Sequence, residues 1–199
     1  MYSKEQIEKA VLSKNYVWFD SSTDYDVNMV SVRNSIPGSK VTNVFDDRLT
    51  LSYKINGVWK FHSWEVTTDP GTKAVKQFSN SKGVAILVPG QYRGSHIIRK
   101  HQGKYDAICQ DKILSVYRDK NKDMKFDMDP NTIETGIFGI NIHRSNPKTE
   151  STFVDGWSEG CTVFKRVKDF NEFMTIMNKA KDIHGNRFSY TLIESKDIK

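Results

Sequence analysis

Apolar residues recur at helical spacing in two stretches, one near each end of the chain. Ser3 and Gln6 stand at the spacing of a capping box before the first stretch, which predicts a short helix over about Lys4–Ser13. The second stretch carries a stripe of phenylalanine, isoleucine and methionine and predicts a longer helix over about Lys168–Ile183. Gly185 stands where such a helix ends. We interpret the stripe as a surface that faces the core.

Between these helices, and again after the second one, apolar residues alternate with a period of two, which is typical of strands. Asn56 and Gly57 lie between two of these runs, and because both residues tolerate positive φ they predict a hairpin turn. The predicted strands cover Asn28–Val32, Leu49–Ile55, Val58–Val66, Val84–Val88, Ile113–Tyr117 and Phe188–Ile193.

The order of these elements predicts the fold class. The 199 residues are enough to bury a core without disulfides or metals, and no repeat, linker or shift of composition divides them. We therefore expect one α+β, β-rich domain over residues 1–199, in which residues 1–27 form the N-terminal helix and a lead-in to the sheet. Aromatic residues make up 12% of the chain, which argues against a disordered protein.

The charge of the chain is mildly basic and evenly spread. Lysine and arginine number 30 against 24 acidic residues, a net charge of +6, but the two signs are mixed along the sequence. Nucleic-acid binding would need a basic cluster with stacking aromatic residues, so we expect no nucleic-acid partner. No apolar run approaches the ~20 residues of a membrane span. The N-terminus lacks the apolar core of a secretory signal, so we expect synthesis in the cytoplasm without a signal peptide.

One histidine and one cysteine in the C-terminal third stand out as candidate catalytic residues. His143 ends a strand-like run in which Phe138, Ile140 and Ile142 alternate with other residues, which places its imidazole on a rigid element. Cys161 follows Ser-Glu-Gly, and the glycine lets the backbone approach a ligand closely. A thiol beside an imidazole is the minimal apparatus for acyl transfer. The residue types alone leave a buried structural cysteine open as the alternative.

The spacing and neighbours of these two residues resemble those of a known family. Cys161 follows His143 by 18 positions, and Ser158 and Gly160 fill their places in a His…Ser/Thr-His-Gly-Cys signature. On these residues the chain resembles the catalytic domain of the L,D-transpeptidases (YkuD-type). The core signature covers Gly139–Thr162. A papain-like enzyme is disfavoured, because in that family the cysteine precedes the histidine.

Two further segments resemble a divergent branch of this superfamily that occurs in tailed phages and some bacteria. They are Thr67–Gly71 and Leu87–Ser95, and with them the resemblance extends over most of the chain, roughly from Asn28 onward. The resemblance implies the β-sandwich of the L,D-transpeptidases. It also implies a protein that acts on the cell wall after lysis or as a component of a virion. We expect a monomer.

The resemblance implies a role for each residue of the signature. Cys161 would be the nucleophile and His143 its base, oriented by the backbone carbonyl of Arg144. The backbone N–H groups of Gly160 and Cys161 would hold the oxyanion. Members of the family transfer an acyl group from a peptidoglycan stem peptide, through a thioester, to an amine or to water, and require no cofactor for catalysis. Stem peptides are thus the expected partner, and the choice between cross-linking and hydrolysis stays open.

Two positions depart from the family's pattern. Glu159 stands where the family usually has a second histidine, and Val163 stands where it usually has arginine or asparagine. Glu159 would change which stem peptide or acceptor fits, or it would disfavour the thiolate if its carboxylate lay close. The alternative is therefore a catalytically inactive module that binds the wall or serves as a structural part of a virion. The residues expected to bind substrate are Arg93, Trp157, Ser158 and Glu159.

A run of alternating oxygen-bearing residues follows the strand predicted to end at Tyr117. Its spacing matches the start of an EF-hand-type calcium loop, so a structural Ca²⁺ is one interpretation. Met124 replaces the expected glycine and Pro130 the bidentate glutamate, so a polar turn is the other interpretation. The candidate ligands are Asp119, Asn121, Asp123 and Asp127.

The remaining histidines and the second cysteine show no metal-binding pattern. None of these histidines stands at a spacing typical of zinc ligands, which argues against a catalytic zinc. His96 and His101 flank a basic stretch, and we expect surface or packing roles for them, with contact to substrate as the alternative. Cys109 lies in a strand-like run and is expected to be buried and inert. The other two histidines are His62 and His184.

Overall fold

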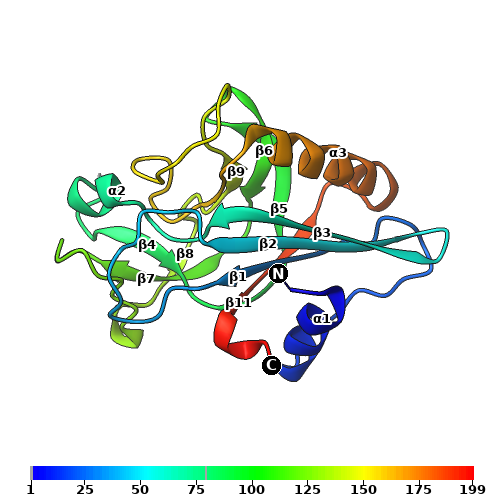
Figure 1. The fold of residues 1–199 in the computed structure, drawn as a ribbon, viewed down its shortest axis with the longest axis horizontal. Coiled ribbons are helices and arrows are strands. Elements are labelled where there is room, and N and C mark those ends of the chain that lie inside the picture. Colours follow the sequence, from blue (N-terminus) through cyan, green and yellow to red (C-terminus); the bar gives the residue numbers. More distant parts are fainter. Residues whose placement is uncertain (1, 79) are drawn as a thin grey trace.

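A computed structural model describes residues 2–78 and 80–199 of the chain. These residues form an eight-stranded barrel, a separate three-stranded sheet and three α-helices (Figure 1), so the strand-rich α+β class is confirmed. In the order in which they pair around the barrel, its strands are β1 (Asn28–Arg33), β11 (Phe188–Glu194), β5 (Gly90–His101), β6 (Tyr105–Gln110), β9 (Ile142–Arg144), β10 (Thr162–Phe164), β3 (Val58–Thr67) and β2 (Asp47–Ile55). The small sheet consists of β4 (Val84–Leu87), β7 (Leu114–Asp119) and β8 (Glu134–Gly136).

Strand β1 closes the barrel because it pairs on both sides. It runs antiparallel to β2 and parallel to β11, so that Val30 lies opposite Thr50 on one side and Thr191 on the other. All six residues of β1 are buried, since Met29 faces the barrel core while Val30 packs under the N-terminal helix. The larger sheet is thus a barrel, and the β-sandwich implied by the resemblance is not confirmed.

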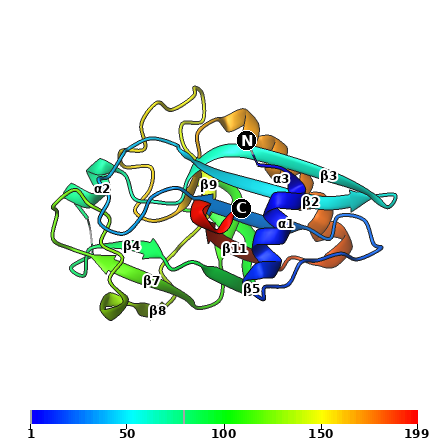
Figure 2. The same cartoon turned by 60° about the horizontal axis from the view of Figure 1, so that its bottom comes forward.

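Helix α1 (Lys4–Ser13) begins at the capping box that the sequence predicts. Ser3 Oγ accepts a hydrogen bond from Gln6 N at 3.2 Å, and Gln6 Oε1 accepts one from Ser3 N at 3.0 Å. The helix buries Ile7, Ala10 and Val11 against β1 and β11. Figure 2 shows it lying across the outside of the barrel. Its apolar side chains therefore cover the outer face of the strands that close the barrel.

Helix α3 (Val167–His184) lies against the two short strands β9 and β10. Its apolar stripe is buried, as expected, and Phe170 and Phe173 pack on Phe164 of β10 with ring centroids 5.6 and 5.1 Å apart. The helix ends at Gly185, whose φ of +86° is one that glycine adopts readily. The apolar stripe thus packs against β9 and β10, the two strands that carry the candidate site.

All six predicted strands are present, with ends that differ by at most two residues. Asn56 and Gly57 form the tight turn between β2 and β3, and both have positive φ (+50° and +75°). The strand-like run around Cys109 is β6. Strands β5, β8 and β10 and the short helix α2 (Thr72–Lys76) were not predicted. Within the described residues, no helix combines the length and the apolar character needed to cross a membrane.

Candidate active site

The parallel pairing of β9 with β10 brings the two candidate catalytic residues together. Ile142 lies opposite Thr162, and His143 lies opposite Val163. Cys161 comes directly before β10, so its side chain lies diagonally from His143 across the two strands. His143 is the middle residue of β9, whereas the sequence predicted that it ends a longer strand.

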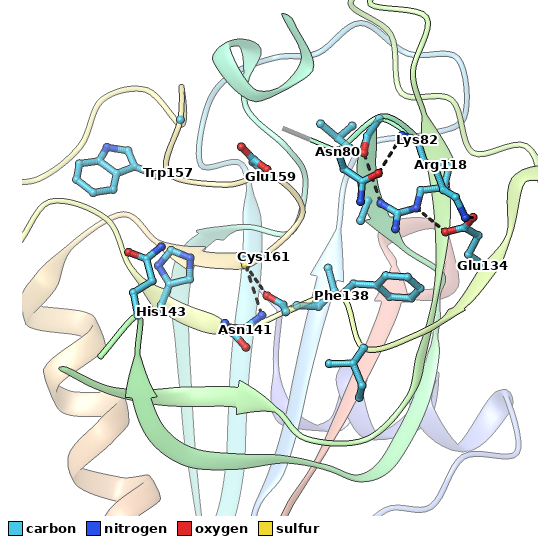
Figure 3. A pocket seen from close by; sticks show the side chains of 18 of the residues that line it. Asn80, Lys82, Arg118, Glu134, Phe138, Asn141, His143, Trp157, Glu159 and Cys161 are labelled. Carbon is cyan, nitrogen blue, oxygen red and sulfur yellow. Dashed lines mark hydrogen bonds and ion pairs between the residues drawn. The ribbon is translucent and has the colours of Figure 1, made fainter. Parts of the chain in front are cut away.

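Cys161 and His143 line the same pocket, which lies between the barrel and the small sheet (Figure 3). The pocket has a volume of about 730 Å³, within the range of about 300–1,000 Å³ that is common for ligand sites. At the end away from the thiol, Arg118 Nε lies 3.0 Å from a carboxylate oxygen of Glu134, which also pairs with Lys82. The pocket therefore holds a thiol at one end and a cluster of charged groups at the other.

The ring of His143 is oriented by the backbone. Nδ1 lies 2.9 Å from the carbonyl oxygen of Arg144, and because a carbonyl only accepts, Nδ1 carries the proton. Nε2 is left with a lone pair, as a general base requires. This is the contact that the resemblance implied for Arg144. Burial, and after it the proximity of His101, lower the pKa of His143 to about 4, so the ring is neutral at pH 7.

Two residues outside the predicted site complete its surroundings. His101, at the end of β5, stacks on His143 with ring centroids 4.3 Å apart and 17° between the planes. Asn141 donates from Nδ2 to His101 Nδ1 at 3.2 Å and from its backbone N–H to Cys161 Sγ at 3.4 Å. Asn141 had a sequence signal, because it stands two positions before His143. For His101 the sequence offered contact with substrate only as an alternative, and its stacking on His143 could not be predicted because it depends on how β5 packs.

The thiol of Cys161 is protonated and hydrogen-bonded. Sγ donates to the carbonyl oxygen of Gly139 at 3.2 Å and accepts from the N–H of Asn141 at 3.4 Å. Burial raises the pKa of Cys161 to about 11, and the carboxylate of Glu159 adds a smaller increase. Among the residues that the structure describes, no hydrogen bond joins Sγ to the ring of His143. The thiol and the imidazole are therefore both neutral, so a reaction of Cys161 as a nucleophile would require the thiol to lose its proton as it attacks.

Ser158 shapes the loop before Cys161 and does not line the pocket. Its buried hydroxyl donates to the carbonyl oxygen of Cys161 at 2.9 Å and accepts from the N–H of Gly160 at 3.1 Å. The sequence assigned Ser158 to substrate binding, but its hydroxyl is used within the loop. The N–H of Gly160 is likewise hydrogen-bonded, to the hydroxyl of Ser158. Of the two amides implied for the oxyanion hole, only that of Cys161 has no acceptor in the described part of the chain.

Gly160 fastens this loop to the small sheet. Its φ is +131°, and a Cβ at this position would lie 1.8 Å from the backbone oxygen of Ala85 in β4. Ala85 N donates to the carbonyl oxygen of Glu159 at 3.3 Å, so the two backbones are in direct contact. Only glycine fits this approach, and β4 thereby fixes the position of the cysteine that follows.

The other residues assigned to substrate binding divide into two groups. Trp157 and Glu159 line the pocket, and Figure 3 shows both on the wall above Cys161. Arg93 does not line it. Its guanidinium lies 5.2 Å from the ring centre of Phe19, on an exposed part of β5. The structure therefore does not bring Arg93 to the candidate site.

The predicted calcium loop pairs its polar groups internally. Asn121 Nδ2 donates to Asp127 Oδ2 at 2.6 Å, and Asn121 Oδ1 accepts from the N–H of Asp123 at 3.0 Å. Burial raises the pKa of Asp119 to about 6, and its buried Oδ1 has no hydrogen-bond partner. Across residues 2–78 and 80–199, no three histidine, cysteine or acidic side chains are arranged to hold a metal ion. The loop is folded as a polar turn, and a structural Ca²⁺ stays a prediction.

The remaining histidines and Cys109 lie outside the pocket lining. His96 is fully buried, its Nε2 donates to the carbonyl oxygen of Ile140 at 2.9 Å, and burial lowers its pKa to about 4. His62 is half-buried on β3 and His184 is exposed at the end of α3. Cys109 is buried, as expected, and burial raises its pKa. Both cysteines are free thiols.

Comparison with known proteins gives no match to this chain among family models, curated proteins or solved structures. A thiol and a base with an available lone pair line one pocket, and the N–H next to the thiol has no acceptor among the described residues. This combination suits nucleophilic attack on a carbonyl carbon.

Proposed function

We propose that this protein is a cysteine-dependent acyltransferase that acts on peptidoglycan stem peptides. One observation carries the proposal: Cys161 and His143 line one pocket, and the Arg144 carbonyl holds His143 with Nε2 available as a base. The resemblance to the L,D-transpeptidase signature supplies the substrate class. The site would act on the cell wall after lysis or as part of a virion.

In the proposed reaction, the Cys161 side chain first turns away from the Gly139 carbonyl. His143 Nε2 then takes the thiol proton while Sγ attacks the acyl carbon, and the Cys161 N–H donates to the oxyanion. The departing amine receives the proton from His143, which leaves a thioester on Cys161. An amine or a water molecule attacks the thioester, returns a proton to sulfur and releases the product. No step requires a metal or a cofactor.

The charges of the pocket suit a peptide that carries both an amine and a carboxylate. Glu159 lies on the wall above the thiol, where it would attract an amino group. At the other end Lys82 and Arg118 share the single carboxylate of Glu134, and the positive charge that remains would attract a carboxylate of the peptide. An acceptor amine close to Cys161 would favour cross-linking, whereas water in the same place would lead to hydrolysis.

An inactive binding module is the second candidate. The thiol is hydrogen-bonded to Gly139, its pKa is raised to about 11, and the Gly160 amide is occupied by Ser158. Each of these features lowers reactivity without closing the pocket. Such a module would bind wall peptides and leave them unchanged.

Incubation with defined muropeptides tests the two candidates. Wild type should convert them, and the product masses identify the reaction: loss of a terminal residue, a new dimer, or a split dimer. Cys161→Ala should give no product, whereas Cys109→Ala, which alters the buried thiol outside the pocket, should keep the activity. Binding of muropeptides by wild type without any product would favour the inactive module.

A further inference from the structure

We propose that His101 is a positioning residue of this acyl transfer, which keeps His143 neutral and directed toward Cys161. The inference rests on the proposed function. The two rings lie nearly parallel, with centroids 4.3 Å apart and 17° between their planes, and both line the pocket. His101 comes from β5 and His143 from β9, so the stack joins two strands that are not neighbours in the barrel.

The contact with Asn141 fixes the protonation of His101. Asn141 Nδ2 can only donate, so His101 Nδ1 accepts this hydrogen bond and carries no proton. The amide of Asn141 cannot be turned round without loss, because its Oδ1 accepts from the backbone N–H of Gln110 at 2.9 Å. His101 is therefore held as a neutral ring with its proton on Nε2.

The same asparagine joins the stacked pair to the nucleophile. Its backbone N–H donates to Cys161 Sγ at 3.4 Å, and its side chain holds His101 against the face of His143. His143 is held at its edge by the Arg144 carbonyl and on its face by His101. Neither contact uses Nε2, which leaves that nitrogen available to receive the thiol proton.

The charges around the stacked rings of His101 and His143 disfavour protonation of both rings at once. Two imidazolium rings at 4.3 Å would repel each other strongly inside the protein. Burial, Lys104 and Arg144 each lower the pKa of His101. Among the described residues that line the pocket, Glu134 and Glu159 are the acidic ones and Cys161 is a further titratable group, while the ring of Tyr105 lies 5.6 Å from that of His101. His143 is thus the ring that receives the proton, and His101 stays neutral beside it.

Acylation by p-nitrophenyl acetate tests this role independently of stem-peptide recognition. The acetyl group passes to Sγ as a thioester, and the thiol proton passes through His143 to the departing p-nitrophenolate. Mass spectrometry then measures how much of the protein is acetylated over time. His101→Ala removes the ring that holds the face of His143, so the base is less well aligned with the thiol and acylation at pH 7 should slow about ten-fold. The midpoint of the acid limb of the rate should rise by about two pH units, toward the ordinary histidine value.

A conservative variant and a matched control accompany this test. His101→Phe keeps an aromatic face against His143 and should restore most of the rate and the low midpoint. His62→Ala removes another stacked imidazole, one that lies between Tyr53 and Trp64 outside the pocket, and should change neither.

The outcomes separate the inference from the proposed function. If Cys161 is acylated through His143 but His101→Ala keeps the wild-type rate and midpoint, the role of His101 is wrong and the proposed function stands. The role of His101 would also be wrong if His101→Phe slowed acylation as much as His101→Ala does. If Cys161→Ala is acylated as fast as wild type, the proposed function fails and the inference fails with it.

Discussion

At the scale of single residues, burial sets the protonation of the proposed catalytic pair. It lowers the pKa of His143 to about 4 and raises that of Cys161 to about 11, so both groups are neutral between these values. Many reactive cysteines are instead thiolates paired with a cation. In this pocket the nucleophile would form only as the substrate is attacked, which protects the resting thiol from oxidation and alkylation.

The pH dependence of the reaction should report this arrangement. His143 acts as a base only when it is neutral, and its lowered pKa keeps it neutral down to about pH 4. We therefore expect kcat/KM to stay level above about pH 5 and to fall with a midpoint near pH 4. His143→Ala should lower kcat/KM by a factor on the order of 10²–10⁴. A midpoint near 6.5, the ordinary histidine value, would contradict the burial of the base.

Sequence reasoning identified the two candidate catalytic residues but not the residues that hold them. Cys161 and His143 were predicted from residue type and spacing, and both line the pocket. His101 was expected to pack or to lie at the surface, because its contact with His143 arises only when β5 and β9 fold into one barrel. Ser158 was predicted to bind substrate, whereas its hydroxyl is hydrogen-bonded within its own loop, an arrangement that depends on local backbone geometry.

At the scale of elements, the small sheet holds the loop that carries Cys161. Gly160 lies so close to the backbone of β4 that no side chain fits between them. Ala85 N also donates to the carbonyl oxygen of Glu159 at 3.3 Å. The small sheet therefore forms one wall of the pocket and also fixes the position of Cys161.

Gly160→Ala should displace this loop. A Cβ would lie 1.8 Å from the Ala85 oxygen at a φ of +131°, so we expect a loss of at least about 2 kcal/mol in the free energy of unfolding, together with most of the activity. Gly38→Ala is the matched control, because Gly38 also has positive φ (+78°) but open space around it, and it should cost only about 1 kcal/mol. Urea unfolding of both variants measures the difference. Equal, small losses would mean that β4 does not hold the loop.

The strength of the local signal decided which elements could be predicted. The caps and stripes of α1 and α3 and the turn at Asn56 and Gly57 are encoded by neighbouring residues, and their positions were predicted to within two residues. Strand β10 has three residues, too few to show a period. Strand β5 contains Gly94 at a φ of +56° and a shift of register against β11, which interrupt its alternation.

At the scale of the whole molecule, closure of the barrel was the feature that the sequence did not reveal. It depends on β1 pairing with β11, two strands from opposite ends of the chain. Closure also buries His96, which packs against Tyr190 of β11 and donates to the carbonyl oxygen of Ile140, next to Asn141. A titratable ring is thus enclosed directly behind the site.

Acid should therefore destabilise the fold through His96. Burial lowers its pKa from 6.5 to about 4, so the unfolded chain takes up a proton at a higher pH than the folded protein does. Above pH 6.5 His96 is neutral in both the folded and the unfolded protein, so it does not reduce the free energy of unfolding. As the pH falls from 6.5 toward 4, protonation of the unfolded chain lowers the free energy of unfolding. Between pH 7 and pH 5 wild type should lose about 2 kcal/mol relative to His96→Gln, measured by urea unfolding. If the free energy of unfolding changed with pH in the same way for wild type and His96→Gln, this prediction would be contradicted.

The most direct test of the account is the mass of the protein during turnover. Wild type mixed with a stem peptide and quenched in acid should gain the mass of one acyl group, and peptide mapping should locate it on Cys161. The adduct should form much more slowly in His143→Ala and be absent in Cys161→Ala. An adduct on another residue, or turnover of the stem peptide by Cys161→Ala, would contradict the central claim that Cys161 is the nucleophile.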